Sequence, residues 1–173
     1  MIEMKRLFFG LAPNEEARAA LSAAAAQLQC EKGRLHESGN YHLTLVFLGM
    51  TPAEAVPQLL RLARLAMREP FELTLSGEMN AFKDGTVPWA AIDPCPALFA
   101  LRGRLSAMLR ENGFPGGDES FTPHITIGRG VRLAAPAPSI RRVSFPVTRV
   151  TLYESLRMDD RLVYRPLNPS ETP

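Results

Sequence analysis

The sequence contains few of the residues that build disulfide or metal-based scaffolds. Of 173 residues only two are cysteines, Cys30 and Cys95, and they lie far apart outside any Cys-x-x-Cys pattern. Two such cysteines supply neither a disulfide framework nor a four-cysteine zinc site. Histidine occurs only three times, without the His-Glu-x-x-His spacing of many zinc enzymes. We therefore predict no metal ligands and no cofactor, and keep a zinc site made of all three histidines as an alternative.

Long apolar runs are also absent. A membrane-spanning helix needs about 20 consecutive apolar residues, and no stretch of this chain approaches that length. The first apolar stretch, Leu7–Phe9, is too short for the hydrophobic region of a secretion signal. With 46% hydrophobic and 22% charged residues, the chain has enough apolar side chains for a core. We expect residues 1–173 to form a single cytoplasmic domain, without membrane contact, that is either one body or two lobes sharing one core.

Lysine is scarce, and most of the basic residues are arginines. Eight arginines but only three acidic residues lie between Arg129 and Arg165, which gives this segment a surplus of five positive charges. Arginine binds phosphate oxygens in a planar, bidentate geometry. The segment therefore indicates an anionic ligand, or else a basic face that is simply exposed to solvent.

Hydrophobic periodicity and turn residues predict alternating strands and helices. Strands are expected over residues 6–11, 42–48, 71–75, 87–92, 124–127, 142–145, 149–156 and 162–167. Helices are expected to begin at Pro13 and at a capping box, Thr51–Glu54, with proline in the first helical position. A third helix is expected over residues 96–110, ended by Asn112-Gly113. Because strands outnumber helices and hairpin-like neighbours alternate with helices, we predict an α+β fold with mainly antiparallel sheet.

Two of the three histidines lie in matching strings. His42-Leu-Thr44-Leu and His124-Ile-Thr126-Ile both read histidine, apolar, threonine, apolar. Threonine occupies nine of 173 positions, so two of three histidines having one two places later is an accident of roughly one in a hundred. Side chains two residues apart share one face of a strand. Each motif therefore predicts an imidazole and a hydroxyl side by side.

The two imidazoles and two hydroxyls converge if the two strands lie face to face across a cleft, and such a set suits the hydrolysis of a phosphodiester. This reaction needs a base to deprotonate water and an acid to protonate the leaving oxygen, and histidine, with an ordinary pKa of about 6.5, does both near neutral pH. The hydroxyls of Thr44 and Thr126 are predicted to donate hydrogen bonds to phosphate oxygens. Arg129, five residues after His124, is the best-placed cation for the phosphate. The residues alone leave open which histidine is the acid.

The doubled motif resembles that of the two-histidine (2H) phosphoesterase superfamily, and in particular its bacterial RNA 2′,3′-cyclic phosphodiesterases, also called 2′-5′ RNA ligases. The strings that carry this resemblance are Arg6–Leu11, Asn40–Gly49, Phe121–Arg129 and Leu152–Ser155, which span most of the chain. One departure is visible, because the family pattern has a glycine in the turn before the last strand where this chain has Asp159-Asp160-Arg161. The shape of that edge of the cleft therefore needs to be checked.

The resemblance implies a bilobal fold, with two pseudo-symmetric lobes of mainly antiparallel sheet, helices outside and a central cleft. It implies a monomeric hydrolase that opens 2′,3′-cyclic phosphate ends of RNA or oligonucleotides to 2′-phosphomonoesters without a metal. His42 would be the general acid and His124 the general base. A weak reverse activity, ATP-independent joining of RNA ends through a 2′-5′ linkage, is implied as well.

Two other functions stay open. One is a phosphodiesterase that acts on a small cyclic phosphate nucleotide instead of RNA. The other is a nucleotide- or RNA-binding module that has the cleft but catalyses nothing, although binding alone needs no second histidine. The third histidine, His36, has no threonine partner two places on, and we expect it to lie in a loop or at the surface.

Overall fold

The structure is a computed structural model that describes residues 1–30 and 32–168. Its elements, in chain order, are β1 (Met4–Leu11), α1 (Glu15–Ala25), β2 (Arg34–Leu35), the 3-10 turn η1 (Ser38–Asn40), β3 (Leu43–Pro52), the 3-10 turn η2 (Ala53–Ala55), α2 (Val56–Ala66), β4 (Phe71–Phe82), β5 (Val87–Ile92), α3 (Pro96–Glu111), β6 (His124–Thr126), β7 (Gly128–Arg129), β8 (Ser144–Val147), β9 (Thr151–Met158) and β10 (Arg161–Pro166). No helix of the described residues is long and apolar enough to cross a bilayer.

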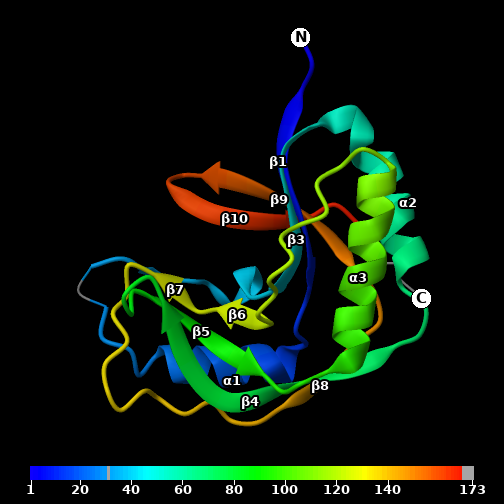
Figure 1. The fold of residues 1–173 in the computed structure, drawn as a ribbon. Coiled ribbons are helices and arrows are strands. Elements are labelled where there is room, and N and C mark those ends of the chain that lie inside the picture. The colour runs from blue at the N-terminus through cyan, green and yellow to red at the C-terminus, as the bar shows by residue number, and fades with distance from the viewer. Residues whose placement is uncertain (31, 169–173) are drawn as a thin grey trace.

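Eight of the strands form one open sheet in the order β10-β9-β1-β3-β6-β5-β4-β8 (Figure 1). All strand pairs of the described residues are antiparallel. The sheet has two halves of four strands, β10-β9-β1-β3 and β6-β5-β4-β8. They meet where β3 pairs with β6 at a single residue pair, Leu43 opposite Ile125, and we call this junction the seam. The predicted α+β fold with mainly antiparallel sheet and outer helices is confirmed.

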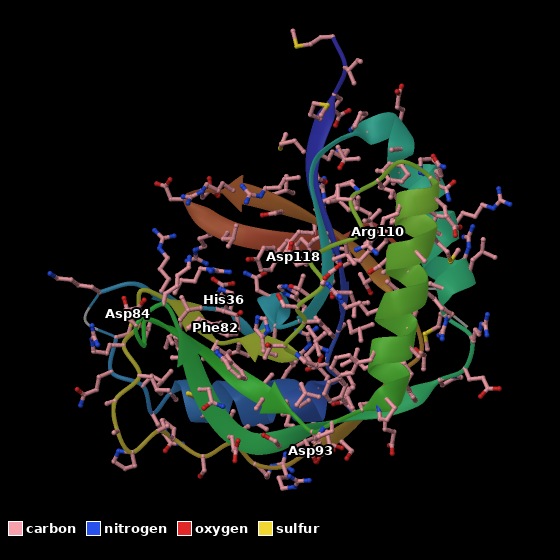
Figure 2. All side chains as sticks on the ribbon, viewed as in Figure 1. His36, Phe82, Asp84, Asp93, Arg110 and Asp118 are labelled. Atoms are coloured by element: carbon pink, nitrogen blue, oxygen red, sulfur yellow. The ribbon has the colours of Figure 1, made fainter. Side chains whose placement is uncertain are left out.

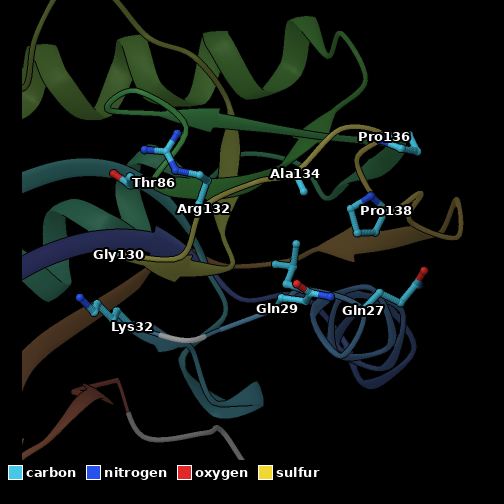
Figure 3. A pocket seen from close by; sticks show the side chains of 10 residues that line it. Gln27, Gln29, Lys32, Thr86, Gly130, Arg132, Ala134, Pro136 and Pro138 are labelled. Atoms are coloured by element: carbon cyan, nitrogen blue, oxygen red, sulfur yellow. The ribbon is translucent and has the colours of Figure 1, made fainter.

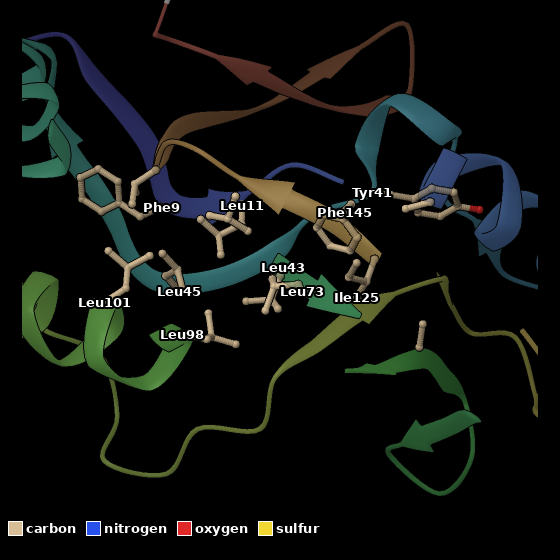
Figure 4. Close-up of a cluster of buried hydrophobic side chains, with 14 of the residues drawn as sticks. Phe9, Leu11, Tyr41, Leu43, Leu45, Leu73, Leu98, Leu101, Ile125 and Phe145 are labelled. Carbon is tan, nitrogen blue, oxygen red and sulfur yellow. The ribbon is translucent and has the colours of Figure 1, made fainter. Parts of the chain in front are cut away.

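The helices cover one face of this sheet, and the core lies between helices and sheet. In α3, Leu98, Leu101, Leu105 and Leu109 recur at helical spacing and are fully buried. Figure 4 shows Leu98 and Leu101 close to Leu45 of β3, within one hydrophobic cluster that also includes residues of α1 and α2. Helix α1 follows β1 in the chain but contacts β8 in the other half of the sheet. The chain therefore crosses between the halves early, and one core serves both.

The predicted starts of the first two helices were wrong. Helix α1 begins at Glu15, because the side chain of Asn14 caps it by accepting a hydrogen bond from the Ala17 N–H at 3.0 Å. Pro13 therefore precedes the cap. The capping box at Thr51 does not form, because Thr51 pairs with Lys5 as β3 continues through Pro52. Tertiary pairing of β3 with β1 thus outweighs a local helix signal, and α2 begins only at Val56.

The last hairpin forms without a glycine in its turn. Asp159 and Asp160 have φ angles of 48° and 61°, in the left-handed region that aspartate visits more readily than most residues. Strands β9 and β10 then pair in register from Met158 opposite Arg161 onward. The backbone carbonyl of Asp160 also accepts a hydrogen bond from the guanidinium of Arg34. The departure from the family pattern therefore leaves this hairpin intact.

Candidate active site

The seam brings the two motifs together. Because Leu43 is opposite Ile125 in an antiparallel pair, the register places His42 beside Thr126 and Thr44 beside His124. The histidines are then diagonal neighbours, a relation that separates backbone positions by roughly 7–8 Å. The two strands therefore do not face each other across a cleft, as the sequence suggested, because they pair edge to edge in one sheet. The apolar residues of both motifs point into the core on the opposite face.

A single cavity of about 590 Å³ lies over the seam. All five residues singled out from the sequence line it: His42, Thr44, His124, Thr126 and Arg129. We call it the histidine cavity. Its other walls come from β1 and from the β9–β10 hairpin. The structure therefore gathers both rings, both hydroxyls and a guanidinium around one space.

The ring of His42 is fixed by hydrogen bonds at both nitrogens. Its Nδ1 lies 2.7 Å from the backbone carbonyl of Asn40, and its Nε2 lies 2.9 Å from Oγ1 of Thr44. A carbonyl oxygen only accepts, so Nδ1 carries the proton, and in the neutral ring Nε2 accepts from the threonine hydroxyl. The Asn40 side chain in turn donates to Leu162 O at 2.7 Å and accepts from Tyr164 N–H at 3.1 Å. Strand β10 thereby holds the turn that orients His42.

Aromatic side chains enclose the same ring. The ring centroids of Phe8, Tyr164 and Tyr153 lie 4.7, 4.9 and 5.5 Å from that of His42. Burial disfavours the charged imidazolium and lowers the pKa of His42 to about 4, although its hydrogen bond to the Asn40 carbonyl acts in the opposite direction. His42 is therefore neutral at pH 7 when the cavity holds no anion.

His124 is held in the same way but less tightly enclosed. Its Nδ1 lies 2.6 Å from the carbonyl of Thr122, so Nδ1 again carries the proton and Nε2 is the free nitrogen. Phe82 and Trp89 lie beside the ring, with centroid distances of 5.0 and 5.7 Å. Burial, opposed by the bond to Thr122, lowers the pKa of His124, and the positive charge of Arg129 lowers it further. Two histidines with the same tautomer therefore present two basic nitrogens.

Arg129 contributes positive charge to the wall of the histidine cavity. It lies in β7, which pairs with Arg34 and Leu35 of β2. Its charge adds to the effect of burial in lowering the pKa of His36 and His42. At Tyr164 it acts against burial, which raises the pKa of the phenol. A group that destabilises imidazolium from this position stabilises a bound anion instead.

The basic C-terminal segment contributes less to this cavity than its charge suggested. Of its eight arginines, only Arg129 and Arg157 line the histidine cavity. Four others form ion pairs: Arg141 with Glu16, Arg142 with Asp93, Arg161 with Glu37 and Arg165 with Glu154. Arg6, which the sequence did not single out, completes the cationic lining. The positive charge of this cavity thus comes from three separate strands.

His36 lies in the loop between β2 and η1, as predicted, but the sequence did not indicate that it also lines the histidine cavity. Figure 2 shows it between the β9–β10 hairpin and the β4–β5 part of the sheet. Its backbone N–H donates to Ile127 O at 2.7 Å, continuing the pairing of β2 with β7. Its Nδ1 is buried and has no hydrogen-bond partner among the described residues, and burial lowers its pKa to about 4. The spacing of His36 could not have indicated its place in the cavity wall, because the pairing of the two short strands β2 and β7 brings it there.

Two further cavities differ in how they relate to the histidines. One, of about 500 Å³, adjoins the histidine cavity and shares Thr44, Phe47 and His124 with it. The other, of about 600 Å³, is lined by residues such as Gln27, Lys32, Thr86 and Arg132 and includes no histidine (Figure 3).

Within residues 1–30 and 32–168, no three His, Cys, Asp or Glu side chains are grouped so as to hold a metal ion.

The fold and this site define a known class of protein. The sequence pattern of the 2′-5′ RNA ligase superfamily matches residues 11–159, and the chain belongs to that superfamily. It is 32% identical to the RNA 2′,3′-cyclic phosphodiesterase of Escherichia coli K12 over 170 residues, covering 96% of each chain. A protein of the same name from Thermus thermophilus is 36% identical over 150 residues, covering 81% of this chain and 74% of the relative. The crystal structure of E. coli LigT complexed with 3′-AMP superposes with a TM-score of 0.84 at 32% identity, covering 96% of this chain and 97% of that one.

Proposed function

We propose that this protein hydrolyses 2′,3′-cyclic phosphate ends of RNA to 2′-phosphomonoesters by acid–base catalysis with His42 and His124. The observation that carries the proposal is the seam, which makes His42 and His124 diagonal neighbours that line one cavity together with Arg129. The relatives named as RNA 2′,3′-cyclic phosphodiesterases support the same substrate class.

The reaction uses the two rings on opposite sides of the phosphorus atom. His124 accepts a proton from water at Nε2 as the water oxygen attacks phosphorus. The P–O3′ bond breaks, and His42 donates the proton from its Nε2 to the leaving 3′ oxygen. Thr44, Thr126 and Arg129 bind the non-bridging oxygens, where negative charge must be held during the attack. The family resemblance assigns acid and base in this order.

The protonated acid depends on the substrate. Both rings have lowered pKa values in the ligand-free cavity, so both are neutral at pH 7. A cyclic phosphodiester brings one negative charge within a few ångströms of them, and an adjacent anion raises the pKa of an imidazole. Substrate binding thus increases the fraction of His42 that carries the proton needed by the leaving oxygen.

We propose that the two sheet halves form one domain. We also propose that the enzyme acts as a cytoplasmic monomer and has a weak reverse 2′-5′ ligase activity. A small cyclic phosphate nucleotide is the second candidate substrate, and the crystal structure of a relative with 3′-AMP supports a cavity of mononucleotide size.

One assay tests the function. Purified protein is incubated in excess EDTA with nucleoside 2′,3′-cyclic phosphates and with an oligoribonucleotide carrying that end. We expect opening of both to the 2′-phosphate, with the oligonucleotide preferred because Arg6 and Arg157 extend the cationic lining. Turnover of the mononucleotide alone would favour the small cyclic phosphate nucleotide as the substrate. Binding without turnover would show that the protein is a binding module and not an enzyme.

A further inference from the structure

His36 is the one histidine of the cavity that the proposed reaction does not use. It lines the same space as His42 and His124 (Figure 2). Tyr164 packs edge-on against its ring, with 6.1 Å between the two ring centroids. It also lies near enough to His42 for its charge to lower the pKa of that ring. A polar ring that lines a catalytic cavity and takes no part in the proton transfers is a candidate for contact with the substrate.

The position of His36 is fixed by the strand that carries Arg129. Strand β2 pairs with β7, and the His36 N–H continues this ladder by donating to Ile127 O at 2.7 Å. The two strands approach closely because Gly128 has no side chain, and a Cβ there would lie 2.8 Å from Arg34 O. His36 therefore keeps a constant place relative to Arg129, the cation expected to bind the phosphate.

The two ring nitrogens of His36 have other surroundings than those of the catalytic rings. In His42 and His124, Nδ1 lies 2.7 and 2.6 Å from a backbone carbonyl, which fixes the proton on Nδ1. In His36, Nδ1 is buried, and no hydrogen-bond partner reaches it from the described residues. Its Nε2 is not buried in this way, so Nε2 is the nitrogen that is open to the cavity.

These surroundings select the tautomer of His36. A neutral imidazole has one N–H and one bare nitrogen, and a buried N–H without an acceptor is the rarer group in folded proteins. The proton of His36 therefore lies on Nε2, the reverse of His42 and His124. A second proton on Nδ1 would place a charged, unpaired N–H in the interior, and burial accordingly lowers the pKa of this ring to about 4. His36 thus presents a neutral N–H donor to the cavity at pH 7.

The acceptor that suits this donor is an anionic oxygen. Arg6, Arg129 and Arg157 line the cavity, and no acidic side chain of the described residues does so. A neutral donor adds a hydrogen bond to a bound phosphate without adding positive charge beside His42. A further cation at this place would lower the pKa of His42 more, as Arg129 already does, and would leave less of the acid protonated.

We propose that His36 is a phosphate-binding residue, whose neutral Nε2–H donates a hydrogen bond to a non-bridging oxygen of the cyclic phosphate. This inference rests on the proposed function for the identity of the phosphate ester. It assigns no proton transfer to His36. Of the three histidines in the cavity, two exchange protons with the reacting groups and the third only binds.

Two substitutions distinguish a hydrogen-bond donor from a residue that only packs. His36→Gln places an amide N–H near the position of Nε2, whereas His36→Phe keeps a ring and removes the donor. We expect His36→Phe to lower kcat/KM for cytidine 2′,3′-cyclic phosphate about tenfold, and His36→Gln to restore it to within about threefold of wild type, because hydrogen bonds to charged groups are the stronger kind. The reverse order, with His36→Phe the more active variant, would overturn the proposal.

The pH profile of His36→Gln separates binding from proton transfer. We expect kcat of this variant to rise and fall at the same pH values as that of wild type, because a donor that stays neutral adds no titration to the profile. Loss of one limb of the profile in His36→Gln would show that His36 exchanges a proton during turnover, and would contradict its assignment as a binding residue.

The tautomer can be read in the wild-type protein independently of its activity. Long-range proton–nitrogen correlation NMR distinguishes protonated from bare imidazole nitrogens. At pH 7 we expect Nε2–H in His36 and Nδ1–H in His42 and His124, and we expect inorganic phosphate to shift the His36 Nε2–H signal downfield. An Nδ1–H tautomer of His36, or a signal that phosphate leaves unchanged, would overturn the proposal. The expected signals in a protein that does not open the cyclic phosphate would contradict the proposed function alone.

Discussion

The two histidine–threonine motifs are almost identical in sequence and differ in their surroundings. His42 is enclosed by three aromatic rings, and Asn40 ties the turn before it to β10. His124 is held through the Thr122 carbonyl, keeps more solvent exposure and lines two cavities instead of one. A duplicated motif thus supplies equivalent chemical groups, and the surroundings decide how each is used. In the proposed reaction the enclosed ring would protonate the leaving oxygen, and the more open ring would activate the nucleophile.

Removing either ring should have the largest effect. His42→Ala and His124→Ala should each reduce kcat for a nucleoside 2′,3′-cyclic phosphate by about 10²–10⁴, because each removes one proton transfer. The double variant should be little slower than the single ones, since the two groups act as a unit. Initial rates measured in EDTA check this expectation. A single variant with the wild-type rate would show that the two motifs are not a catalytic pair.

Substituting the residues that hold the two rings, Asn40 for His42 and Thr122 for His124, should have unequal effects on stability and on kcat. Asn40→Ala leaves Leu162 O and Tyr164 N–H without their partner, so it should cost on the order of 2 kcal/mol in the free energy of unfolding. It should also reduce kcat by about tenfold to a hundredfold through misplacement of His42.

Thr122→Ala is the matched change in the other half of the sheet. It should leave both quantities near wild type, because only the backbone carbonyl of Thr122 contacts His124. Urea unfolding and steady-state kinetics measure the difference. Equal effects of the two substitutions would mean that the halves are supported alike.

The pH profiles should show how the substrate changes both rings. Because burial lowers the pKa of His42 and His124 in the free protein, the optimum of kcat/KM should lie below pH 6.5, the ordinary histidine value. In the complex the phosphate raises these pKa values, so the optimum of kcat should lie higher by about one pH unit. Coincident optima would mean that substrate charge does not tune the pair.

The smallest expected effect concerns His36, the ring without a counterpart in the motifs. Its pKa is lowered to about 4, so between pH 6.5 and pH 4 the unfolded chain binds a proton that the folded protein does not. Stability from this residue is therefore complete above pH 6.5 and is lost as the pH falls toward 4.

The variant that tests this is His36→Phe, which keeps a ring of similar size. Between pH 7 and pH 5 it should lose less stability than wild type by about 2 kcal/mol, measured by urea unfolding at both pH values. An identical loss in both proteins would show that His36 is not held neutral by the fold.

Much of the fold could be predicted from the sequence, because its strongest signals are periodic. Alternation placed Leu43 and Ile125 in the core and their motif neighbours on the other face, as observed. Local signals failed where tertiary contacts competed with them, as at Thr51, which joins β3 instead of capping a helix.

The site was only partly predictable, since its geometry depends on long-range pairing. The spacing within each motif indicated an imidazole and a hydroxyl on one face, but not that β3 and β6 would pair edge to edge. His36 and Arg6 reach the cavity through strand pairings that no local pattern specifies. Four of the eight C-terminal arginines are engaged in ion pairs, which net charge could not reveal.

The seam is also the narrowest connection within the sheet. Since β3 and β6 share a single residue pair there, relative movement of the two sheet halves is least resisted at this line, and such movement alters the separation of the two imidazoles. An anion that binds both rings would connect the two sheet halves across the seam, in addition to the one residue pair that joins them there. Backbone amides flanking Leu43 and Ile125 should then exchange with deuterium more slowly once the cavity is filled.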